Sequence, residues 1–295
     1  MKSLSISRRR FGAALAGGAS LAAVEARSLA AERNTPSTDN LLMAVKWGMI
    51  EQEGSPADKF GLCKELGYDG MELVSPNNPP IQALRAASAA TGMPVHGVVN
   101  DRHWQVRLSA PDQPTRDAGR AILEQAIHDA AAMGGHTVLL VPGVVNGEAT
   151  HEQVWSRSIG EIRQALPLAA SLGVRVLIEN VWNGFCESPE QLRDYLDEID
   201  SPWVGSYYDI GNSQKFSPSE NWIRVLGSRI VKLDIKDWGV TAGFCKIGEG
   251  DVNWPAVRDA LAAIGFSGWC TAEVEGGGRE RLAEIHRRMT TALRA

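Results

Sequence analysis

Short apolar runs alternate with longer amphipathic stretches from residue 44 to the end of the chain. Runs of this length rich in β-branched residues are typical of strands, whereas an apolar period of 3.6 residues is typical of helices. The pattern predicts strands at residues 44–50, 70–74, 95–100, 137–141, 174–179, 204–209, 230–236 and 269–274. Regular alternation of strands with helices predicts a parallel sheet, and eight such units predict a single-domain (β/α)8 TIM barrel.

Several predicted helices have capping signals at their ends. Ser188 and Asn253 stand where they can cap a helix that has proline in its first turn, and Gly92 and Gly173 stand where a helix would end before a strand. An open, doubly wound sheet is the alternative fold. It would usually have a glycine-rich phosphate loop after its first strand, and the sequence has none there.

The first residues of the chain have the pattern of an export signal. The run Ser7-Arg8-Arg9-Arg10-Phe11 fits the twin-arginine pattern, and residues 11–24 are uncharged and rich in Ala and Gly. This apolar stretch is too short to span a bilayer. We therefore expect a twin-arginine signal peptide at 1–31, a short leader at 32–43 and the catalytic barrel at 44–295; a disordered basic tail is the alternative. This predicts the twin-arginine export machinery as a partner, a periplasmic or otherwise exported location and no stable membrane span.

The chain is acidic, with a formal net charge of −5 and 22% charged residues among its 295. Domains that bind nucleic acid usually present a basic face, so this balance argues against a nucleic-acid partner. It does not argue against a small carbohydrate substrate, and a homo-oligomer is also compatible with it. The four cysteines have no metal-finger spacing, and we expect them to be mostly buried or loop thiols.

Four carboxylates stand at the ends of consecutive predicted strands, where the active site of a TIM barrel lies. They are Glu179, Asp209, Asp234 and Glu273. The strand period places Val231, Leu233 and Ile235 on the outer face, so that Lys232, Asp234 and Lys236 point into the barrel.

Four like charges in a poorly solvated barrel mouth repel one another, and a divalent cation is the simplest compensation. Oxygen ligands favour a hard ion, which predicts one Mn²⁺ or Mg²⁺. The alternative is that each carboxylate caps a helix or pairs with a nearby Lys or Arg.

At these residues the chain resembles the xylose isomerase-like TIM-barrel family of sugar isomerases and epimerases, over nearly all of residues 44–290. The motifs that carry the resemblance are Gly70-Met71-Glu72-Leu73, Ile178-Glu179-Asn180, Tyr208-Asp209-Ile210-Gly211-Asn212, Lys232-Leu233-Asp234-Ile235-Lys236-Asp237, Gly248-Glu249-Gly250-Asp251-Val252-Asn253-Trp254 and Gly268-Trp269-Cys270-Thr271-Ala272-Glu273. Each motif is weak alone, but their order and their positions at the strand ends make them specific together.

The resemblance implies metal ligation by Glu179, Asp209 and Glu273, and it implies that Glu179 and Glu273 also act as acid and base. The chain departs from the family at two positions. Asp234 stands where the fourth ligand is usually histidine, and Asn212 stands where another histidine is frequent. We expect Asp234 to be the fourth ligand.

Six further residues are candidates for substrate binding. Trp182 could form a platform for a sugar ring, and His103 together with Trp104 could stack on a sugar or hydrogen bond to it. Lys246 lies in a long loop after the seventh strand. The full set is Glu72, His103, Trp182, Asn212, Lys236 and Lys246. Packing within loops or exposure to solvent is the alternative for the loop residues.

These features predict a metal-dependent isomerase or epimerase that acts on a free keto- or aldo-sugar through an enediolate intermediate. A lyase or hydratase acting on 3-keto-glycosides or related oxidised sugars is the first alternative, because elimination begins with the same proton removal. A non-catalytic sugar-binding module is the second. A DNA-repair nuclease on the same fold would need a histidine-rich multi-metal site and a basic groove, and the sequence offers neither.

Overall fold

The structure is a computed structural model that describes residues 40–76 and 79–294. The expected signal peptide and most of the expected leader lie outside these residues, so export stays a prediction. Within the described part of the chain, none of the helices has both the length and the apolar character needed to cross a bilayer.

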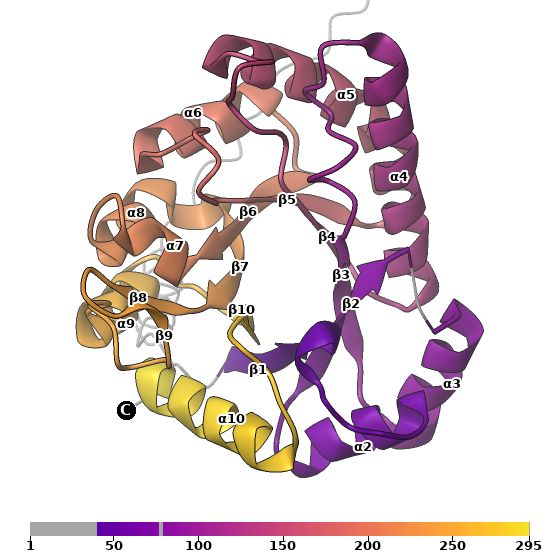
Figure 1. Cartoon of the computed structure of the whole chain (residues 1–295), viewed down its shortest axis with the longest axis vertical. Coiled ribbons are helices and arrows are strands. Elements are labelled where there is room, and N and C mark those ends of the chain that lie inside the picture. Colours follow the sequence, from indigo (N-terminus) through magenta and orange to yellow (C-terminus); the bar gives the residue numbers. More distant parts are fainter. Residues whose placement is uncertain (1–39, 77–78, 295) are drawn as a thin grey trace, which may run out of the picture. The chain divides into compact units, whose positions relative to one another are not determined.

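Eight parallel strands close into a barrel in the order β1-β10-β7-β6-β5-β4-β3-β2 (Figure 1). This arrangement confirms the predicted TIM barrel. The strands are β1 (Leu41–Lys46), β2 (Gly70–Ser75), β3 (Val95–Asn100), β4 (Thr137–Leu140), β5 (Arg175–Glu179), β6 (Val204–Asp209), β7 (Ile230–Ile235) and β10 (Gly268–Ala272).

The first strand is shifted relative to its prediction. β1 begins at Leu41 because residues 41–45 pair in register with residues 268–272 of β10. It ends at Lys46, and Trp47–Met49 form the short 3-10 helix η2. The residue at the catalytic end of β1 is therefore Lys46, which the predicted strand 44–50 placed in its interior.

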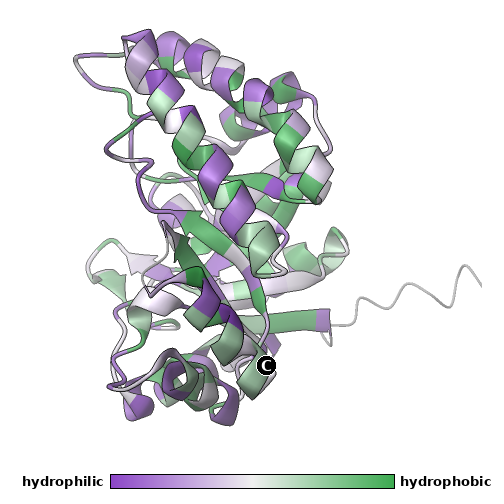
Figure 2. Cartoon of the chain, turned by 90° about the vertical axis from the view of Figure 1, so that its right-hand side faces the viewer, coloured by the Kyte–Doolittle hydropathy of each residue, from purple (hydrophilic) through white to green (hydrophobic). Residues whose placement is uncertain are grey.

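Eight longer helices surround the barrel, and their boundaries follow the capping signals. Ser188 and Asn253 cap helices that have proline in the first turn, and Gly92 and Gly173 end helices with positive φ angles of 64° and 67°. The helices are α2 (Pro56–Glu65), α3 (Ile81–Thr91), α4 (Gln113–Ala132), α5 (His151–Leu172), α6 (Pro189–Ile199), α8 (Ser219–Leu226), α9 (Trp254–Ala263) and α10 (Arg279–Arg294). The strands are mostly hydrophobic, whereas the helices carry hydrophobic and hydrophilic residues side by side (Figure 2).

Most of the core lies between the strands and these helices, and a small second cluster lies inside the barrel. The inner cluster contains Leu139, Leu177 and Tyr207, with Val231 packed against it. The expected outward orientation of Val231 is therefore wrong. The pairing of β6 with β7 shifts by one residue between Ser206 and Tyr207, and this irregularity breaks the simple alternation of the strand.

Polar residues fill the barrel beneath the carboxylates. The Lys232 ammonium group contacts the imidazole of His96 and the hydroxyl of Thr137, and burial lowers the pKa of Lys232 to about 8. The Tyr207 hydroxyl lies 3.1 Å from both carboxylate oxygens of Glu72, to which it donates. These contacts give hydrogen-bond partners to polar groups that are excluded from water. They also form a fixed layer beneath the four carboxylates.

An insertion after β7 forms the antiparallel hairpin β8 (Asp237–Gly239) and β9 (Gly243–Cys245). The fully buried carboxylate of Asp237 organises it. This carboxylate accepts hydrogen bonds from the backbone N–H groups of Trp238 and Gly248 at 2.9 and 2.7 Å and from Trp254 Nε1 at 2.9 Å. A single side chain therefore ties the hairpin to the loop that follows it and to α9.

We expect Asp237→Ala to lower the free energy of unfolding by about 2–4 kcal/mol, because it leaves several buried donors without an acceptor. Urea denaturation followed by circular dichroism measures the change. Asp259→Ala, at an exposed position of α9, is the matched control and should change stability by less than about 0.5 kcal/mol. Equal midpoints for the two variants would contradict this role of Asp237.

Candidate metal and catalytic site

The four carboxylates found at the predicted strand ends converge at the catalytic end of the barrel. Glu179 and Asp209 end β5 and β6, Asp234 is the penultimate residue of β7, and Glu273 directly follows β10. One oxygen atom from each of the four lies within 4.8 Å of the others. Since opposite ligands of a cation with metal–oxygen bonds of about 2.0–2.6 Å lie roughly 4–5 Å apart, this spacing suits a single ion.

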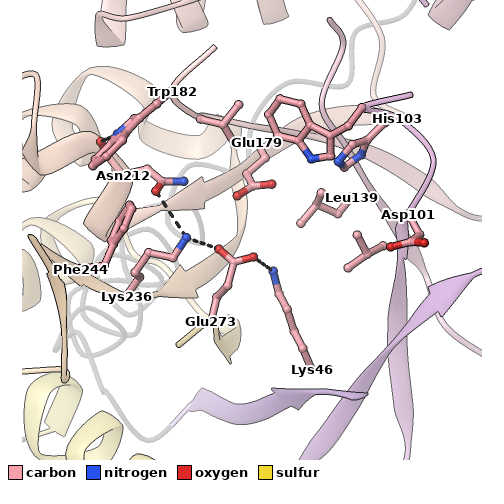
Figure 3. A pocket seen from close by; sticks show the side chains of 13 residues that line it. Lys46, Asp101, His103, Leu139, Glu179, Trp182, Asn212, Lys236, Phe244 and Glu273 are labelled. Carbon is pink, nitrogen blue, oxygen red and sulfur yellow. Dashed lines mark hydrogen bonds and ion pairs between the residues drawn. The ribbon is translucent and has the colours of Figure 1, made fainter. Parts of the chain in front are cut away.

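Two lysines cross-link these carboxylates. Lys46 Nζ lies 2.8 Å from Asp234 Oδ2 and 2.5 Å from Glu273 Oε1. Lys236 Nζ lies 3.0 Å from Asp209 Oδ2 and 2.5 Å from Glu273 Oε2. Figure 3 shows Glu273 held between the two ammonium groups, with Glu179 on the other side of the cavity. The carboxylate of Glu273 is therefore fixed from both sides.

Two asparagines fix the orientation of Asp209. The side chain of Asn180 accepts from the backbone N–H of Asp209 and donates to its carbonyl, both at 2.8 Å. Asp209 Oδ1 accepts from the backbone N–H of Asn212 at 2.7 Å and so caps the short helix α7 (Ile210–Gln214). This leaves Oδ2 as the oxygen that faces the other carboxylates.

Burial and mutual repulsion perturb the cluster strongly. Burial raises the pKa of Glu179 and Asp234 well above the usual range, and the neighbouring Glu273 carboxylate adds to both shifts. Burial also raises the pKa of Asp209 to about 6. Burial opposes ionisation of Glu273 too, but contact with Lys46 and Lys236 holds its pKa far below normal.

The donor set fits a hard divalent cation. Asp209 Oδ2, Asp234 Oδ1 and Glu273 Oε2 are buried and form no hydrogen bond of good geometry, although Lys236 lies within ion-pair distance of two of them. Four carboxylates and two ammonium groups leave two negative charges, which a divalent ion neutralises. Oxygen donors without sulfur or imidazole favour Mg²⁺ or Mn²⁺ over softer metals.

A cavity of about 340 Å³ opens above the cluster. The imidazole of His103 is buried at its edge, where Nδ1 accepts from the backbone N–H of Val141 at 3.2 Å, and burial lowers the pKa of His103 to about 3. A neutral imidazole bound in this way carries its proton on Nε2, which can donate to a ligand. The cavity is lined by Lys46, Val99, Asp101, His103, Trp104, Leu139, Glu179, Val181, Trp182, Asn212, Lys236, Phe244 and Glu273.

Four of the six residues expected to bind substrate line this cavity, namely His103, Trp182, Asn212 and Lys236. The other two lie elsewhere. Glu72 is fully buried below the cluster, where its carboxylate accepts from Tyr207, so it does not reach the cavity. Lys246 is half exposed outside the cavity, and its Nζ lies 2.9 Å from Glu284 Oε1.

Sequence reasoning missed three polar or aromatic lining residues. Lys46 was hidden by the shifted first strand, although a single lysine at the end of the apolar run Leu41–Val45 is a usable signal. Asp101 directly follows β3, just as Glu273 directly follows β10. Phe244 lies on the inserted hairpin, and no strand or helix period indicates its position.

Comparison with known proteins identifies a matching family and several sugar epimerases of similar sequence or fold. The family described as "Xylose isomerase-like TIM barrel" matches residues 60–293. L-ribulose-5-phosphate 3-epimerase of Salmonella heidelberg (strain SL476) is 24% identical over 225 residues, which cover 71% of this chain and 78% of that protein.

Two solved structures show the same fold at low sequence identity. D-allulose 3-epimerase from Methylomonas sp. has a TM-score of 0.73 at 14% identity, covering 86% of this chain and 97% of that one. 3-keto-D-glucoside 4-epimerase from E. coli has a TM-score of 0.73 at 16% identity, covering 85% and 98%.

We expect Lys46→Met to lower the free energy of unfolding of chelator-treated protein by about 3 kcal/mol, because it leaves buried carboxylates without their counter-charge. Adding Asp234→Asn removes the carboxylate that loses its partner. The double variant should therefore be more stable than the sum of the two single changes predicts, by about 1 kcal/mol or more. Urea denaturation of all four proteins measures this coupling. Simple additivity would mean that the contact between Lys46 and Asp234 contributes nothing.

Proposed function

The chain belongs to the xylose isomerase-like TIM-barrel family, and we propose that it is a metal-dependent epimerase or isomerase of a keto- or aldo-sugar. The relative and the solved structures described above are sugar epimerases, which supports an enzyme that acts on sugars. The observation that carries the proposal is the carboxylate cluster, in which Glu179 and Glu273 face one cavity from different strands.

One divalent cation, Mn²⁺ or Mg²⁺, would be held by Glu179, Asp209, Asp234 and Glu273. Such an ion polarises a sugar carbonyl and stabilises the negative charge that develops on its oxygen. Asp209 caps α7 through Oδ1 and Asp234 pairs with Lys46 through Oδ2, and the remaining oxygens, Asp209 Oδ2 and Asp234 Oδ1, are buried without a hydrogen bond and are available to an ion. The two aspartates would therefore act in the reaction only as ligands of the ion. The two glutamates also line the cavity, where they can reach a substrate.

Glu179 and Glu273 would exchange protons with the carbon next to the carbonyl. Figure 3 shows their carboxylates pointing into the same space from opposite sides. One removes the proton and leaves an enediolate, and the other returns a proton. Return to the opposite face of the same carbon inverts that centre, which is epimerisation, and return to the neighbouring carbon is isomerisation.

The groups around the cavity orient the sugar for this exchange. His103 can donate to a sugar oxygen, and the Asn212 side chain lies between Lys236 and the backbone of Asn180, at 3.4 and 3.0 Å. Lys46 and Lys236 hold Glu273 in a fixed position, so little reorganisation accompanies proton transfer. Trp182 presents its ring at the cavity and is fixed by a 2.8 Å hydrogen bond from Nε1 to the carbonyl of Asn212.

Metal content tests the proposed ligand set. We expect mass spectrometry to find about one Mn²⁺ or Mg²⁺ per chain in wild-type protein, and we expect Glu179→Ala and Asp234→Ala to lose most of it. Asp259→Ala is the control with an unrelated carboxylate removed. Loss in Glu179→Ala alone would place Asp234 outside the coordination shell, and a wild type without metal after Mn²⁺ is supplied would contradict the mechanism.

Solvent exchange tests the chemistry. In D₂O the metal-loaded wild type should transfer deuterium to the carbon next to the carbonyl of a ketohexose or a 3-keto-glycoside. Glu179→Gln and Glu273→Gln keep the shape of the side chains but remove the acid–base group, so each should slow exchange by about 10²–10⁴-fold. Release of water or an alcohol together with exchange would identify a lyase. A wild type that exchanges no substrate of either class would support a sugar-binding module instead.

A further inference from the structure

A second hollow, of about 560 Å³, adjoins the carboxylate cavity. The two spaces share Lys236, Phe244 and Glu273 as lining residues. The remaining residues of the second hollow are Cys245, Lys246, Val274, Glu275 and Arg281. The two spaces therefore adjoin, and a ligand bound at the carboxylates can continue past Phe244 into the second one.

The positive charges around the second hollow are balanced by contacts within the protein. Lys246 and Arg281 each lie 2.9 Å from the carboxylate of Glu284, whose pKa is lowered to about 2 by these hydrogen bonds and one from Arg288. Lys236 is bound to Asp209 and Glu273. No basic residue lining the hollow lacks an acidic partner among the described residues, so a phosphate dianion would have to displace existing ion pairs. A neutral ligand with many hydroxyl groups fits these paired cations and the Glu275 carboxylate better.

An exposed aromatic ring stands where the two spaces meet. Phe244 is 52% exposed and stacks on Trp182, with ring centroids 4.6 Å apart and planes inclined by 20°. Together with Trp104, these two residues are the only aromatic side chains among the large, exposed apolar residues of the described chain, and all three line the carboxylate cavity. Exposed apolar surface concentrated at one cavity marks a binding surface, and aromatic faces pack well against the C–H face of a sugar ring.

The position of Phe244 is fixed by the protein. It lies on β9, whose partner strand β8 begins at the buried Asp237 and is anchored by the hydrogen bonds of that residue. The exposure of Phe244 is thus a feature of an ordered hairpin, which keeps an apolar ring in solvent beside the site.

We propose that the second hollow is a subsite for a second, uncharged ring of the substrate, so that the enzyme acts on a glycoside rather than on a free monosaccharide or a sugar phosphate. This inference rests on the proposed function, because it assumes that the first ring lies at the carboxylates. Phe244 would stack against the linkage or the second ring, and Lys246, Arg281 and Glu275 would hydrogen bond to its hydroxyl groups.

Binding of simple probes to the Mg²⁺-loaded protein tests the subsite. Glucose, cellobiose, maltose and glucose 6-phosphate are compared by calorimetry and by saturation-transfer NMR. At least one disaccharide should bind about tenfold more tightly than glucose, and both of its rings should receive saturation. Phe244→Ala and Lys246→Ala should each reduce this advantage, because Phe244 stands where the two spaces meet and Lys246 lines the second hollow.

Val240→Ala is the matched control, because Val240 is 80% exposed next to the same hairpin and lines neither space. Two results would overturn the subsite: no disaccharide binds better than glucose, or glucose 6-phosphate binds most tightly, which would make the hollow a phosphate site. Deuterium exchange into a keto-sugar by the same protein separates the two proposals. If the protein exchanges deuterium but binds no disaccharide more tightly than glucose, only the subsite is contradicted. If it shows neither exchange nor tighter disaccharide binding, the proposed function is contradicted as well.

Discussion

The concentration of negative charge at the mouth of the barrel is the constraint on which the rest of the site depends. Four carboxylates that offer oxygens within 4.8 Å of one another, three of them essentially without solvent contact, cannot all be ionised without compensation. Two partly buried lysines supply half of that compensation. The shortfall of two positive charges is what would make the cluster a site for a divalent cation rather than a closed set of salt bridges.

The layers below and around the cluster are arranged to keep it rigid. The Tyr207 hydroxyl links Glu72 to Thr271, and Lys232 links β7 to His96 and Thr137, so the barrel interior is bound together by polar contacts under the site. Buried networks of this kind are costly unless every member is satisfied, and a satisfied network defines one arrangement. The carboxylates therefore meet in fixed positions, as metal binding and proton transfer require.

Strand periodicity was sufficient to predict the barrel and the convergence of Glu179, Asp209, Asp234 and Glu273, because the carboxyl ends of the parallel strands meet at one end of a barrel. It failed where the period itself is interrupted. The irregular pairing of β6 with β7 turned Val231 inward, and the pairing of β1 with β10 moved the strand end to Lys46. Phe244 lies on an inserted hairpin whose position depends on the tertiary contacts of Asp237. Such contacts leave no periodic signal in the local sequence.

The aspartate at position 234 and the lysine at position 46 are best understood together. The family pattern that this chain resembles usually has histidine at the strand-seven position, which binds a metal as a neutral ligand. An aspartate there adds one negative charge to a buried cluster, and that change alone would be strongly unfavourable. Lys46 Nζ lies 2.8 Å from Asp234 Oδ2 and adds one positive charge at the same place. Because Lys46 also contacts Glu273, the substitution of the ligand is coupled to the position of a proposed acid–base residue. Within this chain Lys46 thus offsets the negative charge that Asp234 brings to the site, and together with Lys236 it places two ammonium groups against the carboxylate that would handle the proton.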